Sequence, residues 1–380
     1  MELAELRKSL DEIDEQIVSL YEKRMKICAG VAEYKIETGK QVLDTAREAE
    51  KIAKVKELVK DPGNRQGVEE LFEQIMSMSR KLQYKMLAEG KNQLRLPFDM
   101  VESLPTENMH VVFQGSEGSY SQEACIRFFG KKADAFHVES FRDAMNALEE
   151  GRADYAVLPI ENSTAGIVNE IYDLLVEYEN YIVGEQIIKI EHCLMACEGA
   201  TKDTIRTVYS HPQSLMQCAR YLQQYDWQQI SMKNNAFAAK KVADEKDITE
   251  AAIAGEHAAE AYGLNILEKS INQSETNSTR FVILSNRKIY CKNAKKVSIC
   301  FELPHKSGSL YHALSHVIFN NLNMTKIESR PIEDRNWEYR FFVDFEGNLT
   351  DSAVMNALRG LREETRSMKI CLLYTSPSPR

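Results

Sequence analysis

Two cations interrupt the apolar face of the long helix that the first 35 or so residues predict. Arg24 and Lys35 are eleven positions apart, so their side chains differ by about 20° around the helix and both follow its apolar line. Buried cations need an anionic partner, whereas cations at a helix edge reach solvent without one. Ser79 and Gln83 interrupt the apolar line of another helix in the same way. Polar groups at core positions of two helices indicate a polar cavity that binds an anion.

Further charged residues accompany this predicted cavity. Asp44, Arg47 and Glu48 gather at the start of a second helix, where the alternative is a solvated face with a local ion pair. Arg7 lies 17 positions before Arg24, about 100° away around the helix. We therefore expect Arg7 to reach the cavity of a partner chain rather than its own.

Three helices must position these side chains, and they make up residues 1–90. Apolar residues recur there at intervals of three and four, which predicts one helix of about 35 residues and shorter helices at about 44–60 and 66–89. Helices of such unequal length pack poorly as a monomer, so we expect an interlocked homodimer or a higher homo-oligomer. Residues 91–109 contain two prolines among short polar stretches and are predicted to be a linker.

Strand and helix patterns alternate over residues 110–286, which predicts an α/β domain. The segment GSEGSYS follows its first strand and opens a helix, where backbone N–H groups can hold an anion. The third glycine of a dinucleotide-binding loop is missing, which argues against NAD. Residues 297–370 read β-α-β-β-α and predict a ferredoxin-like α+β module, a fold that a final strand usually closes.

The composition places this chain among cytoplasmic globular proteins. Its 380 residues carry a net charge of −9 with 43% hydrophobic residues, enough for real cores and unfavourable for binding nucleic acid. No apolar run is long enough to span a membrane, and no secretory signal opens the chain. The eight cysteines are scattered, and Cys193 and Cys197 have no second pair to complete a metal site, so we expect reduced thiols and no metal.

The last ten residues, CLLYTSPSPR, differ from everything before them. They resemble the translation of a sequencing-library adapter, so residues 371–380 are interpreted as a non-native tail and given no function. The alternative is a genuine short, disordered Ser/Pro-rich tail. On the first interpretation the natural C-terminus, and with it the final strand of the α+β module, is missing.

The segments LRKSLDEIDEQIVSL, EKRMKICAGVAEYK, VLDTAREAE and LFEQIMSMSRKLQ together resemble the small all-helical chorismate mutase domain. This resemblance implies a pericyclic conversion of chorismate to prephenate that needs no cofactor. The site must hold a dianion in a compact conformer and stabilise charge that grows on its ether oxygen. In the family, arginines grip the carboxylates while lysine and glutamine donate to that oxygen. The residues it implies are Arg7 from the partner chain and Arg24, Lys35, Asp44, Arg47, Glu48, Ser79 and Gln83.

The segments ADYAVLPIENSTAGIVNEIYDLL, SHPQSLMQC, AAIAGEHAAEAYGL and NSTRFVIL resemble prephenate dehydratase. The resemblance implies two α/β lobes similar to periplasmic binding proteins, with a cleft in which prephenate loses carbon dioxide and water. Thr279 matches the family's signature catalytic residue. The other implied residues are Glu161, Asn162, Ser210, Gln217 and Arg280.

Each of these other residues has a purely structural alternative. In this alternative, Glu161 and Asn162 cap the helix that follows them, and Ser210 caps the next helix along its own segment. Arg280 is then an ordinary ion-pair partner. A threonine hydroxyl is a weak acid, so Thr279 is expected to orient the departing hydroxyl. Glu161 is a candidate proton donor if burial raises its pKa.

Residues 297–370 resemble the ACT domain, an amino-acid-sensing module. The segment KIESRPI carries the clearest match, at Glu328, Ser329 and Arg330. The other ligand loop of the family is matched less well, by Gly308 and Leu310 within SGSL. The resemblance implies that L-phenylalanine binds between paired modules; the alternative is a dimerisation module without a ligand.

Together these resemblances predict a multidomain, bifunctional chorismate mutase–prephenate dehydratase of phenylalanine biosynthesis that phenylalanine inhibits. Two alternatives stay open at this point. One is a non-enzymatic amino-acid sensor, which the complete set of polar cavity residues and the Thr-Arg-Phe segment disfavour. The other is a mutase fused to a different prephenate-using enzyme such as a dehydrogenase, which the incomplete glycine pattern disfavours.

Overall fold

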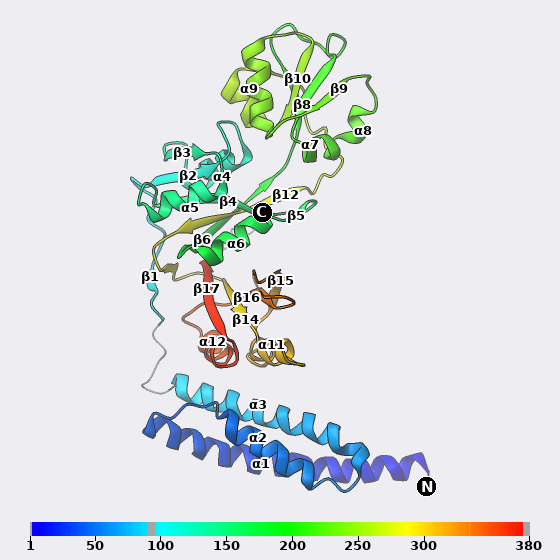
Figure 1. Ribbon diagram of the computed structural model, residues 1–380, viewed down its shortest axis with the longest axis vertical. Coiled ribbons are helices and arrows are strands. Elements are labelled where there is room, and N and C mark those ends of the chain that lie inside the picture. The colour runs from blue at the N-terminus through cyan, green and yellow to red at the C-terminus, as the bar shows by residue number, and fades with distance from the viewer. Residues whose placement is uncertain (1, 90–95, 334, 375–380) are drawn as a thin grey trace. The chain divides into compact units, whose positions relative to one another are not determined.

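The computed structural model describes residues 2–89, 96–333 and 335–374, and these form two compact units (Figure 1). The first unit combines Met1–Leu96 with Ile299–Lys369, and the second combines Pro97–Ser298 with Ile370–Arg380. Within the predicted linker, residues 91–95 lie outside the described residues. Its remainder contains the short strand β1 (Asp99–Val101), which pairs in parallel with β13 (Ile289–Cys291).

The N-terminal part of the first unit is all-helical, as predicted. Helix α1 begins after a capping box formed by Glu2 and Glu5 and ends at Gly39, whose left-handed backbone (φ 67°) suits glycine. Asp44 caps α2 by accepting a hydrogen bond from the Arg47 amide. The elements are α1 (Leu3–Thr38), α2 (Thr45–Glu57), a 3₁₀ turn at Pro62–Asn64 and α3 (Arg65–Glu89).

One face of α1 remains uncovered in the single chain. Only Ala32 of this helix is buried, whereas the large apolar side chains of the predicted stripe are between 41% and 70% exposed. They are Leu3, Leu6, Leu10, Ile13, Ile17, Leu20, Ile27, Val31 and Tyr34. A continuous apolar stripe of this length is typical of a surface that another protein chain covers.

The C-terminal part of the first unit has the predicted β-α-β-β-α order. Its three strands pair in the order β15-β16-β14, and Gly360 of α12 leaves room for the ring of His316 on α11. The elements are β14 (Lys296–Glu302), α11 (Ser309–Phe319), β15 (Met324–Pro331), β16 (Tyr339–Glu346) and α12 (Ser352–Glu364).

The expectation that a final strand is missing is wrong. Strand β17 (Ser367–Tyr374) follows α12, and its Leu372, which belongs to the second unit, pairs in parallel with Ile182 of that same unit. Residues 371–374 of the predicted tail therefore continue a strand, because backbone pairing places few demands on side-chain identity. Residues 375–380 of that tail lie outside the described residues.

The first lobe of the second unit is built on strands that pair in the order β6-β12-β4-β2-β3. Helix α4 covers them through a cluster that includes Val111, Phe113, Ala124 and Phe281. The strands are β2 (His110–Gln114), β3 (Asp134–Val138), β4 (Tyr155–Asn162), β6 (Tyr181–Lys189) and β12 (Ser278–Ser285), with β5 (Gly166–Ile167) paired to β4. The helices are α4 (Tyr120–Phe129), α5 (Phe141–Glu149) and α6 (Asn169–Glu177).

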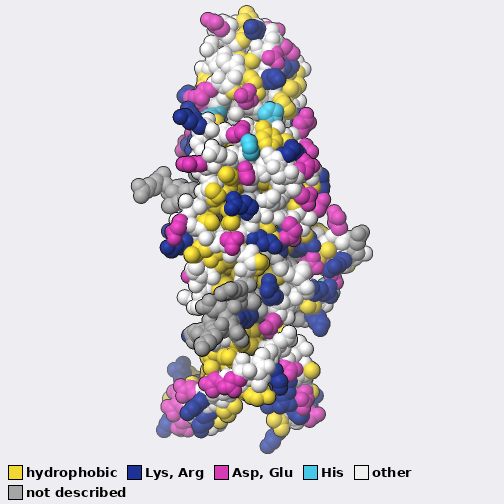
Figure 2. Space-filling model, turned by 90° about the vertical axis from the view of Figure 1, so that its left-hand side faces the viewer, with side chains coloured by type: hydrophobic (Ala, Val, Ile, Leu, Met, Phe, Trp, Pro, Cys, Tyr) yellow, Lys and Arg dark blue, Asp and Glu magenta, His cyan; other side chains and the backbone are white. Residues whose placement is uncertain are grey.

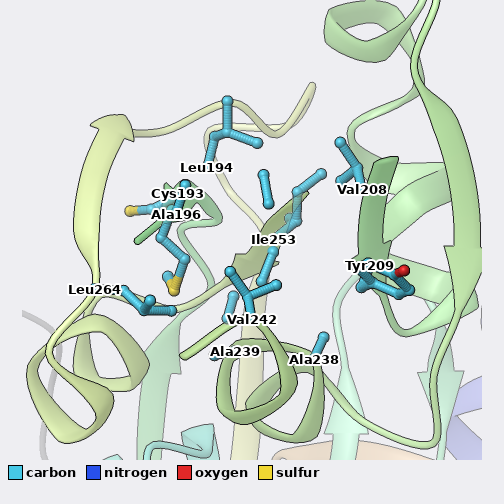
Figure 3. Packing of buried hydrophobic residues seen from close by; sticks show 14 of the residues in the cluster. Cys193, Leu194, Ala196, Val208, Tyr209, Ala238, Ala239, Val242, Ile253 and Leu264 are labelled. Atoms are coloured by element: carbon cyan, nitrogen blue, oxygen red, sulfur yellow. The ribbon is translucent and has the colours of Figure 1, made fainter. Parts of the chain in front are cut away.

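The second lobe has its own sheet in the order β11-β7-β10-β8-β9. Figure 3 shows its core, in which Leu194, Val242 and Ile253 come together from β7, α9 and β10. Its strands are β7 (Cys193–Ala196), β8 (Thr207–Ser210), β9 (Gln228–Ser231), β10 (Glu250–Ala254) and β11 (Asn265–Glu268). Its helices are α7 (Pro212–Gln217), α8 (Ala219–Leu222), α9 (Asn235–Glu245) and α10 (Glu256–Tyr262).

Two chain crossings join these lobes, after β6 and before β12. Strands β6 and β12 pair antiparallel up to Lys189 and Ser278. His192, which follows β6, and Asn277, which precedes β12, therefore lie where the lobes meet. Both side chains are buried at this junction. The two-lobed architecture therefore places polar groups between two rigid cores.

On the face drawn in Figure 2, basic and acidic side chains are mixed rather than gathered into one basic surface. No helix in the described ranges has the length and apolar character that crossing a bilayer requires. None of the eight cysteines, all of which lie in the described ranges, forms a disulfide. Across the described parts of the chain, no three His, Cys, Asp or Glu side chains are arranged to hold a metal ion.

Candidate functional sites

The first candidate site is a cavity of about 240 Å³ among the three N-terminal helices. Its wall combines basic, acidic and amide side chains with a few apolar ones, as the interrupted apolar lines predicted. It is lined by Arg24, Cys28, Lys35, Val42, Asp44, Arg47, Glu48, Lys51, Met76, Ser79, Arg80 and Gln83. Seven of the eight residues implied by the mutase resemblance are therefore brought together.

The two cations of α1 point into this cavity rather than to solvent. Arg24 donates to the Ser79 hydroxyl and, at 3.4 Å, to the Ile75 carbonyl. Lys35 Nζ donates to the carbonyl oxygen of Val42 at 2.7 Å. The alternative in which these side chains extend outward from a helix edge is wrong, because polar partners on α3 and on the loop before α2 hold them inside.

The acidic residues of the cavity have different partners. Asp44 is occupied with capping α2, and Arg47 also pairs with the exposed Glu50 at 2.7 Å. Glu48 lies within 2.6 Å of Arg80 through both of its carboxylate oxygens. Arg80 is thus a cavity residue that sequence reasoning missed, since a basic residue in an exposed-looking Ser-Arg-Lys run carries no local signal of burial.

Gln83 and Arg7 are the two remaining residues that the mutase resemblance implies. Gln83 is buried in the cavity wall, and its acceptor Oε1 has no hydrogen-bond partner among the described residues. Arg7 is exposed and does not line the cavity of its own chain. This placement agrees with the angular argument that separates Arg7 from Arg24 on one helix.

The second candidate site is a cavity of about 300 Å³ between the two lobes of the second unit. Asn162, Gln217 and Thr279 line it, so three of the residues implied by the dehydratase resemblance meet there. The GSEGSYS loop contributes Gly115, Gly118, Ser119, Tyr120 and Ser121. A side chain on Gly118 (φ 74°) would place its Cβ 2.7 Å from the Cα of Ala258, so this close approach of the lobes requires glycine.

A chain of hydrogen bonds links the lobes through this cavity. Asn162 Nδ2 donates to Thr279 Oγ1 and to Asn277 Oδ1, each at 2.9 Å. Asn277 Nδ2 donates to Gln217 Oε1 at 3.1 Å, and Gln217 Nε2 donates to Thr164 Oγ1 at 2.8 Å. Because the Thr279 oxygen accepts from Asn162, the hydroxyl proton of Thr279 is free to point elsewhere.

His192 extends this network, although its sequence context gave no reason to select it. Its Nε2 lies 2.9 Å from Gln217 Oε1 and its Nδ1 lies 3.0 Å from the Tyr120 hydroxyl. Gln217 Oε1 can only accept, so the neutral Nε2–H tautomer satisfies the contact with Gln217. In this tautomer Nδ1 is an acceptor and shares the single proton of the Tyr120 hydroxyl with the Glu191 carbonyl, which lies 2.9 Å from that hydroxyl. Burial lowers the pKa of His192, with the Gln217 hydrogen bond opposing it, and favours this neutral form. The imidazole is therefore suited to positioning Gln217.

The cavity has an anion-binding character without containing a lysine or arginine in its wall. Residues at the N-termini of α4 and α9 line it, where unpaired backbone N–H groups and the helix dipole favour negative charge. Asn235 Oδ1 accepts from the Ser214 hydroxyl at 3.1 Å and from the His211 amide at 3.2 Å. This arrangement turns the Asn235 NH₂ group toward the ligand space.

Three predicted dehydratase residues do not line this cavity. Ser210 is fully buried, and its hydroxyl donates to the Ile253 carbonyl of the neighbouring strand at 2.6 Å rather than to the cavity. Arg280 pairs with Glu161 at 3.0 Å and with Glu185 at 3.4 Å. Successive side chains of a strand face opposite sides of its sheet, so the faces that carry Thr279 and Asn162 cannot also carry Arg280 and Glu161. Glu161 therefore lies in an ion pair with Arg280 and outside the cavity wall.

A third cavity, of about 330 Å³, lies in the C-terminal part of the first unit. It is lined by Leu303, Pro304, His305, Lys306, Ser307, Ser309, Leu310, Trp337, Glu338, Tyr339 and Phe341. The predicted Leu310 is therefore in its wall, as are both sequence neighbours of the predicted Gly308. Ser329 lies directly opposite Phe341 across β15 and β16, whereas Glu328 and Arg330 lie opposite Phe342 and Arg340. Ser329 and Pro331, which lies opposite Tyr339, therefore share a sheet face with the cavity wall, whereas Glu328 and Arg330 do not.

Comparisons with known proteins follow the same division. Residues 6–84 match the family model described as chorismate mutase type II, and residues 111–289 match that of prephenate dehydratase. The chain is 33% identical to an Escherichia coli (strain K12) protein named bifunctional chorismate mutase/prephenate dehydratase, over 98% of this chain and 96% of the relative. A protein of the same name from Aquifex aeolicus is 32% identical, over 98% of each chain.

Two solved structures resemble the larger part of the chain. The prephenate dehydratase of Arthrobacter aurescens in complex with L-Phe superposes with a TM-score of 0.66 at 26% identity, covering 70% of this chain and 90% of that one. A structure described as GqqA, a novel type of quorum quenching acylase, has a TM-score of 0.66 at 29% identity and covers 71% of this chain and 98% of that one. The two-lobed fold is thus shared with solved dehydratases.

Proposed function

Because this chain belongs to the family of bifunctional chorismate mutase/prephenate dehydratases, we propose that its helical cavity and its interlobe cavity carry the two activities. The protein is a chorismate mutase and a prephenate dehydratase of phenylalanine biosynthesis. Neither a non-enzymatic sensor nor a mutase joined to a dehydrogenase fits matches to both enzyme families. The observation that carries the site assignment is that each cavity gathers residues from the segments that match one family.

In the helical cavity, Arg24 and Arg47 bind the two carboxylates of chorismate and hold it in the compact conformer that rearrangement requires. Lys35 and the NH₂ group of the Gln83 amide donate to the ether oxygen, where charge grows as the C–O bond breaks. Ser79 keeps Arg24 in place, and Asp44 fixes the start of α2, as their hydrogen bonds support. No group needs to exchange a proton or an electron with the substrate.

In the interlobe cavity, the helix N-termini and Asn235 bind the carboxylates of prephenate. Thr279 donates its free hydroxyl proton in a hydrogen bond to the departing ring hydroxyl, while Asn162 fixes the Thr279 oxygen from behind. The electrons of the breaking carboxylate C–C bond enter the ring as the hydroxide leaves, and aromatisation drives the step. The hydroxide must collect one proton to depart as water, and it takes this from solvent or from a group along the Thr279 network.

The C-terminal part of the first unit is an ACT domain that senses L-phenylalanine. Its β-α-β-β-α order, its cavity next to Leu310 and the L-Phe complex of the similar dehydratase from A. aurescens support this assignment. Gly308 and Leu310 are assigned to the loop that holds the effector, and Ser329 to the adjoining strand. Glu328 and Arg330 belong to the opposite sheet face, so we assign them to the contact between modules rather than to the ligand.

The active protein is a homodimer in which α1 packs along α1 of a second copy. The exposed apolar stripe of α1 supports this assembly, because leaving such a stripe in water would cost roughly 25 cal/mol for each Å² of apolar surface. The dimer also explains why Arg7 lies outside the cavity of its own chain. In the assembly, Arg7 of one copy completes the mutase cavity of the other.

One coupled assay tests the proposed function. Purified protein is given chorismate, and prephenate and phenylpyruvate are followed separately with and without L-phenylalanine. We expect chorismate to disappear, phenylpyruvate to form without NAD, and phenylalanine to slow the second step. If prephenate accumulates without turnover in the wild-type protein, the assignment of the interlobe cavity is refuted.

A further inference from the structure

Arg80 connects the mutase cavity to the C-terminal module of the same unit. Its side chain is buried on α3, and its Nη1 donates to both carboxylate oxygens of Glu48 at 2.5 and 2.6 Å. Its Nη2 donates to Glu364 Oε1, at the last residue of α12, at 2.9 Å. A single guanidinium is therefore shared between a carboxylate of the cavity and a carboxylate of the module.

Glu48 needs such a partner if the cavity takes a dianion. A lone carboxylate in the wall would repel the two carboxylates of chorismate, and an ionised carboxylate offers only acceptor atoms. The ring hydroxyl of chorismate supplies a donor for which Glu48 is the matching acceptor. A charge-assisted pair with Arg80 neutralises Glu48 while leaving lone pairs for that hydroxyl, and it fixes the direction in which the carboxylate points.

Glu364 in turn holds Arg80 in place. Burial raises the pKa of the Glu364 carboxyl, but His316 and Arg80 outweigh this and lower it, so the group is charged. Nearby, Glu363 accepts a hydrogen bond from the Tyr84 hydroxyl and another, at 3.1 Å, from the Leu43 amide. The end of α12 is thus attached both to α3 and to the loop that precedes α2.

We propose that Arg80 is a positioning residue for Glu48 and that Glu364 of the C-terminal module supports it, so that this module is a structural part of the mutase site. The inference rests on the assignment of the helical cavity to the mutase reaction. It goes beyond that assignment because it joins the mutase site to the module proposed to sense phenylalanine. Loss of the module's contact is then expected to weaken chorismate binding directly.

Steady-state mutase kinetics of four full-length proteins test the first half of the inference: wild type, Arg80→Met, Glu48→Gln and the double variant. Hydroxyl binding contributes to ground state and transition state alike, so Arg80→Met should raise KM for chorismate about tenfold and change kcat less than about threefold. In the Glu48→Gln background the same substitution should change KM less than about threefold, because a neutral amide needs no cation. Arg80→Lys should lie between wild type and Arg80→Met.

A purely structural role for Arg80 would give a different result. It would reduce the amount of folded enzyme, and hence kcat, equally in both Glu48 backgrounds, and dehydration of supplied prephenate reports whether the chain remains folded. An unchanged KM in Arg80→Met, or an equal rise in KM in both backgrounds, refutes the positioning role. If instead wild type itself lacks mutase activity, the proposed function fails before this inference is reached.

Glu364→Gln tests the second half, with Glu346→Gln as the matched control. Glu346 is an exposed carboxylate on β16 of the same module, so the control removes one charge without touching Arg80. We expect Glu364→Gln to raise KM for chorismate about threefold or more, and Glu346→Gln to leave it unchanged. Equal KM values for the two variants refute the role of the C-terminal module.

Discussion

Asn162 and Thr279 face each other across the paired strands β4 and β12, and the Asn162 amide donates to the Thr279 hydroxyl at 2.9 Å. The same amide also lies 2.9 Å from Asn277 Oδ1 and 3.2 Å from the Ser278 carbonyl. Asn162 therefore keeps its orientation when Thr279 changes. The strand pairing makes the hydroxyl a fixed element of the cavity wall whose role can be tested without disturbing its neighbours.

Thr279→Ala should abolish dehydration while the mutase reaction continues. The variant removes the hydroxyl proposed to orient the leaving group, a loss expected to cost ~10²–10³ in kcat, and prephenate should accumulate from chorismate. Thr279→Ser, which keeps the hydroxyl, should retain most of the activity. Phenylpyruvate formation by Thr279→Ala at the wild-type rate would remove this residue from the mechanism.

Lys35→Ala should have the opposite effect. Losing the proposed donor to the ether oxygen should lower the mutase rate ~10²–10³-fold, while supplied prephenate is still dehydrated. Lys60→Ala, at an exposed position after α2, is the control for loss of one lysine charge. The assignment of Lys35 does not survive if its variant stays within a few fold of the control.

Arg7 and Arg24 should complement each other across the dimer. Arg7→Ala and Arg24→Ala chains should each have low mutase activity, and mixing them through reversible dissociation should restore part of it. Half of the cavities in a mixed dimer contain neither substitution. Mixed dimers demonstrated by differential tagging but inactive would place both arginines in one chain's site.

Lys81 should make the stability of the first unit depend on pH. Burial lowers the pKa of Lys81 to about 7, Arg80 lowers it as well, and Glu364 opposes them. The ammonium also lies 3.1 Å from the centre of the Phe319 ring, which favours its charged form and reduces the effect. In the unfolded chain the pKa is near 10.4, so between pH 7 and 10 the unfolded state binds more protons and the free energy of unfolding rises with pH.

Lys81→Met should therefore raise the melting temperature most at pH 6.5, where the buried ammonium is charged, and least at pH 9.5. The expected stabilisation at the lower pH is about 1–3 kcal/mol. Lys85→Met, an exposed lysine on the same helix, serves as the control and should shift both melts equally. A gain that is independent of pH would show that Lys81 keeps an ordinary pKa.

Ser329→Trp should weaken inhibition of the dehydratase by phenylalanine without changing its uninhibited rate. Ser329 lies opposite Phe341 in the wall of the proposed effector cavity, so an indole there competes with the ligand for space. Met324→Trp, at the far end of β15, is the matched control. Calorimetry should show phenylalanine binding to wild type and to the control. Equal binding by the Ser329 variant would move the effector site elsewhere.

Local sequence determined the elements and much of both sites. The three-and-four spacing of apolar residues predicted α1 over nearly its whole length, since helix periodicity depends on neighbours within one turn. The segments ADYAVLPI and RFVIL predicted strands where the structure has β4 and β12. The same spacing placed Arg24 and Lys35 in one cavity, because residues eleven positions apart on a helix share a face.

Tertiary structure decided which of these residues face each other and which do not. Glu161 and Asn162 are adjacent in sequence, but strand alternation sends only Asn162 into the interlobe cavity. His192 acquires its role from Gln217 and Tyr120, which other elements bring to it. Arg80 meets Glu48 from 32 positions away and Glu364 from 284. Such partners are set by how helices and strands pack, and no pattern within one or two turns of the chain encodes them.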